Sequence, residues 1–370
     1  MLKEGVVYDY LVIGGGIAGL SSAYHLAKDG HTVAVFEKND GKQSASFNST
    51  AMMCHDPDVD WSVVISRFGL SGAKDMWELS ELGMKVLTEY AHEQVPGFIS
   101  KRVPSHIFSN SKEKSAELRE QHELYRKIGI PATFTENGSS LLSPFKSFLT
   151  IENDGTTNNQ AILRTLTRKV RGLGGKIFQN HPVEAVSFTS GIAEISSSGK
   201  VFRGKEAILT TGDQQLFPDL PKTETKRTFV VGYENHALPE LFRSSILWDN
   251  EEPYHYIRSF KGYTIWVGGE DVKEKEYDPK KDYSAAIETF AREHLLFDSS
   301  YKRVSDWSGT FYPAENGIPH IGKVSDKPLY VAIGFGGTGV VMSFVSGYLL
   351  ASWTKGAEKK YEPLFAIPHP

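Results

Sequence analysis

The sequence has little cysteine, no excess of basic residues and no long apolar run, and each absence excludes a class of function. Cys54 is the single cysteine, so the chain holds neither an internal disulfide nor a cysteine-ligated metal or iron–sulfur cluster. The formal net charge of -4 leaves no basic surplus for binding nucleic acid. No stretch of about 20 apolar residues is present to span a membrane, and residues 1–8 lack a signal-peptide pattern. We therefore expect a cytoplasmic protein without a metal site, whose redox chemistry, if any, needs an organic cofactor.

What is present begins with a glycine-rich stretch near the N-terminus. Residues 11–13 are typical of a buried strand, and Gly14, Gly16 and Gly19 follow with G-x-G-x-x-G spacing before a helical pattern. Gly14 permits a tight turn, Gly16 lets a pyrophosphate approach the backbone, and Gly19 lets the helix pack closely on the strand. The helix start offers free N–H groups and a favourable dipole to the phosphates. The predicted site therefore includes Ile17 and Ala18 of the first turn.

An acidic residue ends the next predicted strand, at residues 32–36. Glu37 lies 18 residues beyond Gly19, close to the spacing of about 20 expected for a carboxylate that hydrogen-bonds an adenosine ribose. A carboxylate here disfavours a 2′-phosphate and hence NADP, but the motif alone does not separate FAD from NAD. Lys38 and Ser46 lie in the polar loop that follows, which either contacts the cofactor or is a solvated surface loop.

A second glycine-rich turn lies near the C-terminus. Residues 329–333 predict a buried strand, residues 334–339 a turn and residues 340–354 an apolar helix. This turn, which contains Gly336, Gly337, Thr338 and Gly339, again places free N–H groups at a helix start. It does not indicate a second dinucleotide, because no acidic strand end follows it.

The remaining pattern predicts two interleaved domains in an α/β fold. Residues 228–272 are strand-rich and aromatic and predict a second sheet, with a helix over residues 283–296 behind it. A helical pattern at residues 158–174 and a buried strand at residues 207–212 return the chain to the nucleotide domain. We expect a Rossmann-like domain from residues 1–95, 155–215 and 303–370, and an α+β substrate domain with an antiparallel sheet from residues 96–154 and 216–302.

Together these residues resemble the FAD-dependent D-amino-acid oxidase and glycine oxidase superfamily over nearly the whole chain. The resemblance rests on six stretches, namely residues 14–19 with Glu37, the loop around Ser46, and residues 207–212, 307–309, 316–322 and 334–339. Residues 67–69, 253–258 and 268–271 are most similar to the branch that often carries an added Rieske domain. We expect that domain to be absent here, because the sequence has no cysteine pairs and stops soon after the last predicted helix.

The resemblance implies FAD as the cofactor and oxidation of an amine or amino acid as the reaction. Gly14, Gly16 and Gly19 would bind the pyrophosphate and Glu37 the ribose. Val183 would lie near the adenine, Gly212 would join the cofactor site, and residues 336–339 would lie at the flavin ring. A hydride leaves the carbon that bears the amine, and water hydrolyses the resulting imine. Oxidation of a 2-hydroxy acid, or a flavoprotein that acts only as an assembly factor, are the alternatives. The electron acceptor and the oligomeric state stay open.

The substrate side departs from the family pattern. Glycine oxidases place an arginine that clamps the substrate carboxylate where this chain has Phe311. Arg258 either replaces that clamp or forms an ion pair elsewhere. Strand alternation puts Tyr254, Tyr256 and Arg258 on one face and His255 on the other, so we take Tyr254, Tyr256 and Arg258 as the catalytic candidates.

Three other residues have alternative interpretations. Cys54 and His55 either attach the flavin covalently, as in some relatives, or are a small buried cysteine and a solvated histidine. His320 is more consistent with packing than with catalysis. The lysine that some relatives use near the flavin cannot be placed by motif, and Lys261 is only nearby in sequence.

Overall fold

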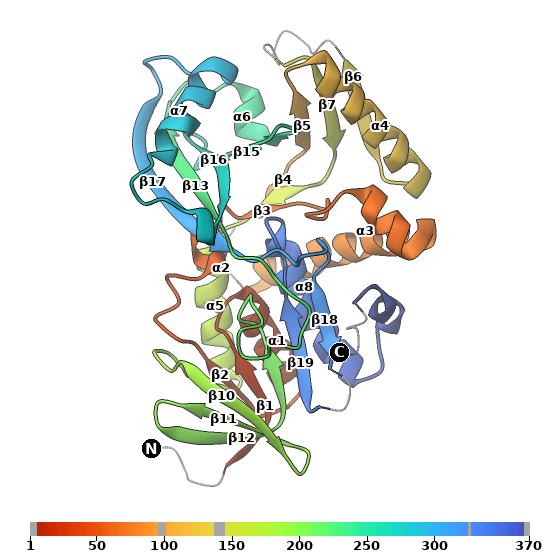
Figure 1. The fold of residues 1–370 in the computed structure, drawn as a ribbon, viewed down its shortest axis with the longest axis vertical. Coiled ribbons are helices and arrows are strands. Elements are labelled where there is room, and N and C mark those ends of the chain that lie inside the picture. The colour runs from red at the N-terminus through yellow and green to blue at the C-terminus, as the bar shows by residue number, and fades with distance from the viewer. Residues whose placement is uncertain (1–5, 95–100, 137–144, 325–326, 366–370) are drawn as a thin grey trace.

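The computed structural model describes residues 6–94, 101–136, 145–324 and 327–365. Two eight-stranded sheets, each with its own helices, form the lower and upper parts of the molecule (Figure 1). This arrangement confirms the expected α/β class, with a Rossmann-like domain and a second sheet of mainly antiparallel strands.

The first sheet has the parallel core expected of a nucleotide-binding domain. Its central strand β1 (Val7–Ile13) lies between β2 (Val33–Phe36) and β12 (Lys200–Leu209), and all three are parallel. Two strands extend the parallel core, namely β9 (Lys176–Phe178) beyond β2 and β19 (Leu329–Ile333) beside the second half of β12. Three strands pair antiparallel, namely the hairpin β10 (Val183–Thr189) and β11 (Ile192–Ser197) on the first half of β12, and β18 (His320–Lys323) on β19.

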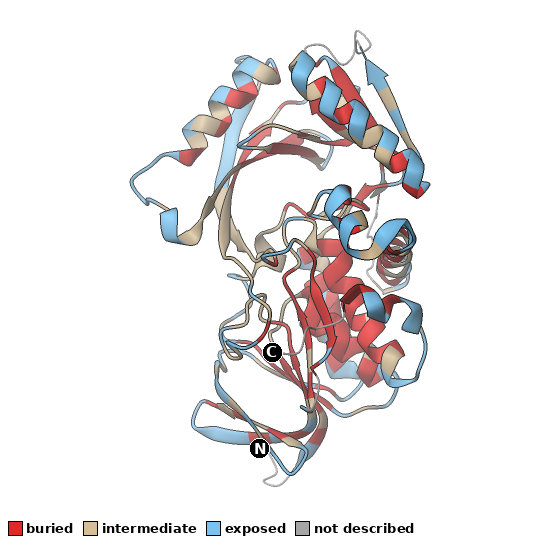
Figure 2. Cartoon of the chain, turned by 45° about the vertical axis from the view of Figure 1, so that its right-hand side comes forward, coloured by how far each residue is buried: buried red, intermediate tan, exposed pale blue. Residues whose placement is uncertain are grey.

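Three helices cover this sheet and form the most deeply buried part of the chain (Figure 2). They are α1 (Ile17–Lys28), α5 (Asn159–Gly172) and α8 (Gly339–Thr354). Helix α8 is apolar on nearly all sides, as a helix enclosed by other elements must be. It crosses α1 so closely that the Ser21 hydroxyl donates to the Phe344 carbonyl at 2.7 Å. The two helices that follow the glycine-rich turns are therefore packed against each other.

The second sheet is formed by strands from widely separated parts of the sequence. In spatial order they are β17 (Lys302–Phe311), β13 (Lys226–Glu234), β16 (Thr264–Lys273), β15 (His255–Phe260), β14 (Ile246–Asp249), β5 (Ser105–Ser109), β7 (Ser147–Ile151) and β6 (Ala132–Glu136). Helices α4 (Lys112–Ile128), α6 (Glu240–Ser244) and α7 (Tyr283–His294) pack on it. The expected domain boundary at residue 303 places β17 with the nucleotide domain, yet β17 pairs with β13 along its length. A boundary near residue 312 would follow the sheets better, and the division into domains stays a proposal.

The remaining elements join the two parts. Helix α3 (Trp61–Gln94) bends at Gly69, whose φ of 70° is outside the helical region. A small sheet combines β3 (Met52–Met53), β8 (Gly155–Thr156) and β4 (Lys101–Arg102). The short pieces are α2 (Ala45–Asn48) and two 3₁₀ segments, Glu274–Glu276 and Lys359–Phe365. Within the described ranges, no helix has the length and apolar character needed to cross a membrane.

Helix ends follow the capping residues that the sequence supplies. The Ser111 side chain accepts the Lys114 N–H at the start of α4, and Gly129 ends that helix in the left-handed conformation. Asn158 caps α5 by accepting the Ala161 N–H at 3.0 Å. Helix α5 lies within the residues 158–174 that the sequence predicts.

Candidate active site

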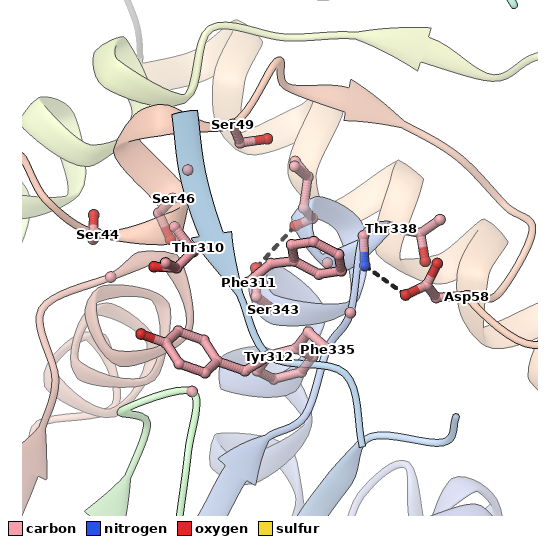
Figure 3. Close-up of a pocket in the computed structure, with 18 of the residues that line it drawn as sticks. Ser44, Ser46, Ser49, Asp58, Thr310, Phe311, Tyr312, Phe335, Thr338 and Ser343 are labelled. Atoms are coloured by element: carbon pink, nitrogen blue, oxygen red, sulfur yellow. Dashed lines mark hydrogen bonds between the residues drawn. The ribbon is translucent and has the colours of Figure 1, made fainter. Parts of the chain in front are cut away.

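One elongated cavity of about 1000 Å³ is lined by residues of both sheets. At one end lie the glycine-rich turn after β1 and the start of α1. At the other lie the aromatic side chains of β15 and the residues that precede it, including Trp248 and Tyr254. The turn before α8 and the end of β17 also line the cavity, and Figure 3 shows Phe311 of β17 near Thr338 of that turn. The two glycine-rich turns that are far apart in the sequence thus line one cavity.

The first glycine turn has the backbone geometry that its spacing predicts. Gly14 has a φ of 113°, and a Cβ there would lie 2.7 Å from the Thr210 carbonyl oxygen. A Cβ at Gly19 would clash with the Gly14 carbonyl, because α1 packs directly against the turn. Gly16 lines the cavity, whereas Gly19 lies behind the turn and does not. Gly14 also lines the cavity, so two glycines of the motif face it and the third lets the helix pack against the turn.

The start of α1 and the end of β2 present complementary groups to a dinucleotide. Helix α1 has no acidic residue in its first turn, so its dipole favours an anion. The Ser46 hydroxyl accepts the Ile17 N–H at 3.0 Å, which brings the polar loop to the helix start. Glu37 is buried and accepts the Gly15 N–H at 2.9 Å through Oε2. The loop that carries Ser46, the start of α1 and the Glu37 carboxylate therefore lie next to one another.

All predicted cofactor residues except Gly19 line the cavity, namely Gly14, Gly16, Ile17, Ala18, Glu37, Lys38, Ser46, Val183, Gly212, Gly336, Gly337, Thr338 and Gly339. The structure adds a residue that the sequence did not single out. Asn159 is 3% exposed, lines the cavity and leaves its side-chain oxygen without a hydrogen-bond partner. A buried acceptor without a donor is costly, so a ligand hydroxyl or N–H would complete it. The donor set and the shape of the cavity fit FAD.

Tyr254 and Tyr256 line the other end of the cavity, as expected for the substrate side. The Tyr256 hydroxyl lies 3.1 Å from the Thr228 hydroxyl of β13, which is separated from β15 by β16. Burial, with the nearby Asp271 carboxylate, raises the pKa of both phenols, so both stay protonated near neutral pH. Phe311, in the position of the family's clamping arginine, also lines the cavity and lies in the view of Figure 3 between Ser46 and Asp58.

Arg258 does not reach the cavity, which contradicts the expectation that it clamps a substrate there. Its guanidinium is buried and donates to three backbone carbonyls, those of Thr50, Ala51 and Thr157. It also lies over the Trp266 ring, at 5.2 Å from the ring centroid. Burial lowers its pKa to about 10, so it remains charged. Arg258 thus fastens the loop before β3 to the second sheet, a role that strand alternation alone could not distinguish from a clamp.

His255 lies on the opposite face of β15, in agreement with the expected alternation. Its Nδ1 is 3.1 Å from Asp249 Oδ2 and its ring stacks on Phe290. His320 is buried in the first sheet, and burial lowers its pKa to about 4. Neither histidine, nor Lys261, lines the cavity. The His255 and His320 rings are therefore packed within the protein, away from the cavity.

Asp58 is the main site residue that the sequence analysis missed. Its Oδ2 accepts the Gly337 N–H at 2.6 Å, so a carboxylate lies at the turn assigned to the flavin (Figure 3). Asp58 is exposed within the cavity, but the surrounding protein raises its pKa to about 6 by desolvation. In the sequence it appeared only within an Asp-Pro-Asp turn signal, which carries no indication of its distant partner.

Cys54 and His55 have environments that do not favour covalent attachment of a flavin. Cys54 lines the cavity, but burial raises its pKa well above the usual range and keeps the thiol protonated. His55 is fully buried rather than solvated, does not line the cavity and stacks on Trp77. Its Nδ1 lies 2.5 Å from Asp154 and its Nε2 3.1 Å from Glu81, so carboxylates occupy both ring nitrogens.

A family model described as "FAD dependent oxidoreductase" (DAO) matches residues 9–353. The chain belongs to the DAO family of FAD-dependent oxidoreductases. It is 22% identical over 98% of its length to the "Putative Rieske 2Fe-2S iron-sulfur protein YhfW" of Bacillus subtilis, of which it covers 72%. It is 21% identical over 100% of its length to the gamma-glutamylputrescine oxidoreductase of Escherichia coli, of which it covers 88%.

A solved structure also shares this fold. The glycine oxidase of Geobacillus kaustophilus matches with a TM-score of 0.82 at 19% identity, over 98% of this chain and 99% of that one. The resemblance drawn from the sequence is thus confirmed at the level of family and fold. This DAO-family chain is an oxidoreductase that uses FAD.

Proposed function

We propose that this DAO-family enzyme oxidises the C–N bond of an amine or amino acid, with the substrate bound at the Tyr254 end of the cavity. The observation that supports it most is the continuity of that cavity. It runs from the nucleotide loop to an aromatic chamber, so a single FAD would have its pyrophosphate at Gly16 and its ring beside Gly337 and Phe311. The small-molecule substrate would then lie against the ring, where Tyr254 and Tyr256 form a wall.

FAD, when bound, supplies the two-electron acceptor for the hydride that leaves the substrate carbon. The chain's own residues hold and enclose the reactants. The start of α1 and Glu37 fix the nucleotide end, while Tyr254, Tyr256 and Phe311 exclude bulk water and orient the C–H bond. Water then hydrolyses the imine to a carbonyl compound and ammonia. The electron acceptor that reoxidises FAD is oxygen or another partner, which the test below separates.

Two alternatives share this fold, oxidation of a 2-hydroxy acid and retention of FAD by a non-catalytic assembly factor. A hydroxy acid must bind through its carboxylate, and the cavity presents Phe311 where the family clamp would be. That observation favours an amine over a hydroxy acid. The cytoplasmic location expected from the sequence also stays a proposal.

An anaerobic reduction screen tests the proposal directly. Purified holoenzyme is mixed in a stopped-flow instrument with panels of amines, amino acids and 2-hydroxy acids, and bleaching of the flavin absorbance is followed. We expect reduction by members of the first or second panel, and peroxide on admission of air if oxygen is the acceptor. Reduction by hydroxy acids alone would contradict the proposal. Reduction by dithionite but by no panel would favour the assembly factor.

A further inference from the structure

The substrate end of the cavity is strongly acidic. Apart from the nucleotide end, its lining includes a set of carboxylates and one cation, namely Asp56, Asp58, Asp60, Asp249, Glu251, Glu252 and Lys114. Asp56 accepts hydrogen bonds from Trp61 and Tyr125, and Asp249 is bonded to His255. Lys114 is paired with Glu117 at 3.0 Å. The electrostatic potential at this end of the cavity is therefore negative, so it attracts cations and repels a carboxylate.

The two arginines near the site, Arg258 and Arg227, are bonded to other protein groups. Arg258 is bonded to backbone carbonyls, as described above. Arg227, on strand β13, forms a bidentate ion pair with Glu274 and lies over the Tyr277 ring. Neither lines the cavity. A bidentate carboxylate clamp of the kind that arginine provides is therefore not available from these side chains.

Lys226 is the cation whose charge does act on the site. It lies opposite Phe311 in the β13–β17 pairing, and its charge favours the ionised forms of Asp58 and Asp271. It does not line the cavity, and two carboxylates share its influence. Lys226 thus helps keep Asp58 negative, and its alternative role, binding a substrate carboxylate, is tested below.

Asp58 and Tyr254 converge on the same point of the second glycine turn. A Cβ at Gly337 would lie 3.3 Å from Asp58 Oδ1 and 3.5 Å from the Tyr254 hydroxyl oxygen. Asp58 Oδ2 is held by the Gly337 N–H, so Oδ1 is the oxygen left for a ligand. A carboxylate oxygen beside a phenol and an aromatic face is a recognised arrangement for binding an alkylammonium group.

We propose that Asp58 makes this enzyme select an amine without a carboxylate on the reacting carbon, by holding the substrate ammonium group against the turn beside Tyr254. The oxidation step in this inference rests on the proposed C–N oxidation, whereas the binding of the ammonium group at Asp58 does not. The bound amine gives one proton to Asp58 and a hydride from the carbon to FAD. Its nitrogen lone pair becomes the C=N bond, and water converts the iminium ion to an aldehyde or ketone and an ammonium ion.

A binding experiment tests the selectivity without turnover. Holoenzyme with oxidised FAD is titrated with tetramethylammonium and, separately, with acetate, and perturbation of the flavin absorbance is recorded. We expect saturable binding of tetramethylammonium at least ten-fold tighter than any binding of acetate. Asp58→Asn keeps an oxygen for the Gly337 N–H and removes the charge, and should weaken cation binding by about 10- to 100-fold, because the attraction between the carboxylate and the cation is lost. Asp75→Asn, on α3 outside the cavity, is the matched control and should change nothing.

Matched substrate pairs then test the same residue during reduction. Each pair differs by one carboxylate on the reacting carbon: butylamine with 2-aminopentanoate, putrescine with ornithine, and dimethylamine with sarcosine, with both enantiomers where they exist. We expect faster flavin reduction per unit concentration by the amine of a pair, and loss of that preference in Asp58→Asn but not in Asp75→Asn.

The two proposals fail in different ways. Tighter binding of acetate than of tetramethylammonium, or a preference for the amino acids that Lys226→Gln abolishes, would overturn the role of Asp58 while leaving C–N oxidation intact. Selective binding of tetramethylammonium that depends on Asp58, without reduction by any amine or amino acid, would support the cation site and contradict C–N oxidation. Cation binding that Asp58→Asn and Asp75→Asn leave equally strong would also overturn the inference.

Discussion

The nucleotide end and the substrate end of the cavity are built in different ways. The nucleotide end is lined by the backbone of one continuous segment, residues 14–17, with Glu37 at the end of the next strand. The substrate end uses side chains from four separate segments, represented by Asp58, Thr228, Tyr254 and Phe311. Backbone recognition demands glycine at fixed spacing, whereas side-chain recognition demands only that distant residues meet. The first kind of site is visible in a sequence and the second mostly is not.

The largest expected effect is at Gly19, because the close packing of α1 depends on it. A Gly19→Ala side chain would clash with the Gly14 carbonyl and crowd the Thr210 hydroxyl, at 2.7 Å. We expect loss of most bound FAD and destabilisation of about 3 kcal/mol, the upper range for overpacking, measured by flavin absorbance and urea unfolding. Gly172→Ala, in α5 with no atom within 4 Å of its Cβ, is the control and should be neutral or slightly stabilising. Equal behaviour of the two variants would contradict this account of the motif.

Substitution of Arg258 distinguishes a structural role of this residue from a catalytic one. Arg258→Met removes the side-chain donor of the Thr50 and Thr157 carbonyls, while the Ala51 carbonyl still accepts the Thr157 N–H. We expect a loss of about 2–3 kcal/mol in unfolding free energy, because buried acceptors then lack partners. Arg258→Lys should recover part of that stability, since it keeps one charged donor. A variant with unchanged stability but a raised KM for amino acids would instead show that Arg258 is the carboxylate clamp.

Sequence analysis could predict the parts of the molecule that depend on local rules. The helical pattern at residues 158–174 predicted α5, and the G-x-G-x-x-G spacing predicted the turn at Gly14. It could not predict that Asp58 bonds to Gly337, because those residues are 279 positions apart and no local pattern links them. It assigned Arg258 to the correct strand, but a charged residue on an inward face has no signature that separates a carbonyl network from a ligand.

His55, in the same loop as Asp58, should make the stability of the protein depend on pH. Burial alone would lower its pKa, but hydrogen bonds to Asp154 and Glu81 outweigh burial and raise it to about 9 from the ordinary 6.5. The protonated ring therefore stabilises the folded state fully below pH 6.5, and this contribution falls as the pH rises toward 9 and is lost above it. We expect the unfolding free energy to fall by on the order of 2 kcal/mol across that interval.

Urea unfolding at a series of pH values measures this dependence. His55→Gln should be less stable than the wild type at pH 6 and should show a flatter profile between pH 6.5 and 9. Because His55 anchors the segment that leads to Asp58 without lining the cavity, FAD content should be retained at pH 6. An unchanged pH profile in the variant would show that another group is responsible.

The smallest expected effect is at Glu37, where a charge rather than a packing contact is changed. Glu37→Gln keeps an oxygen that can accept the Gly15 N–H but removes the charge that strengthens a hydrogen bond to a ribose hydroxyl. We expect FAD affinity to fall about ten-fold, equivalent to about 1.4 kcal/mol, with unfolding of the FAD-free protein unchanged. Glu184→Gln, an exposed residue of β10, is the charge-matched control. Should the FAD-free variant also lose stability, Glu37 would act mainly by fixing the Gly15 turn, and the nucleotide end would depend on side-chain support as the substrate end does.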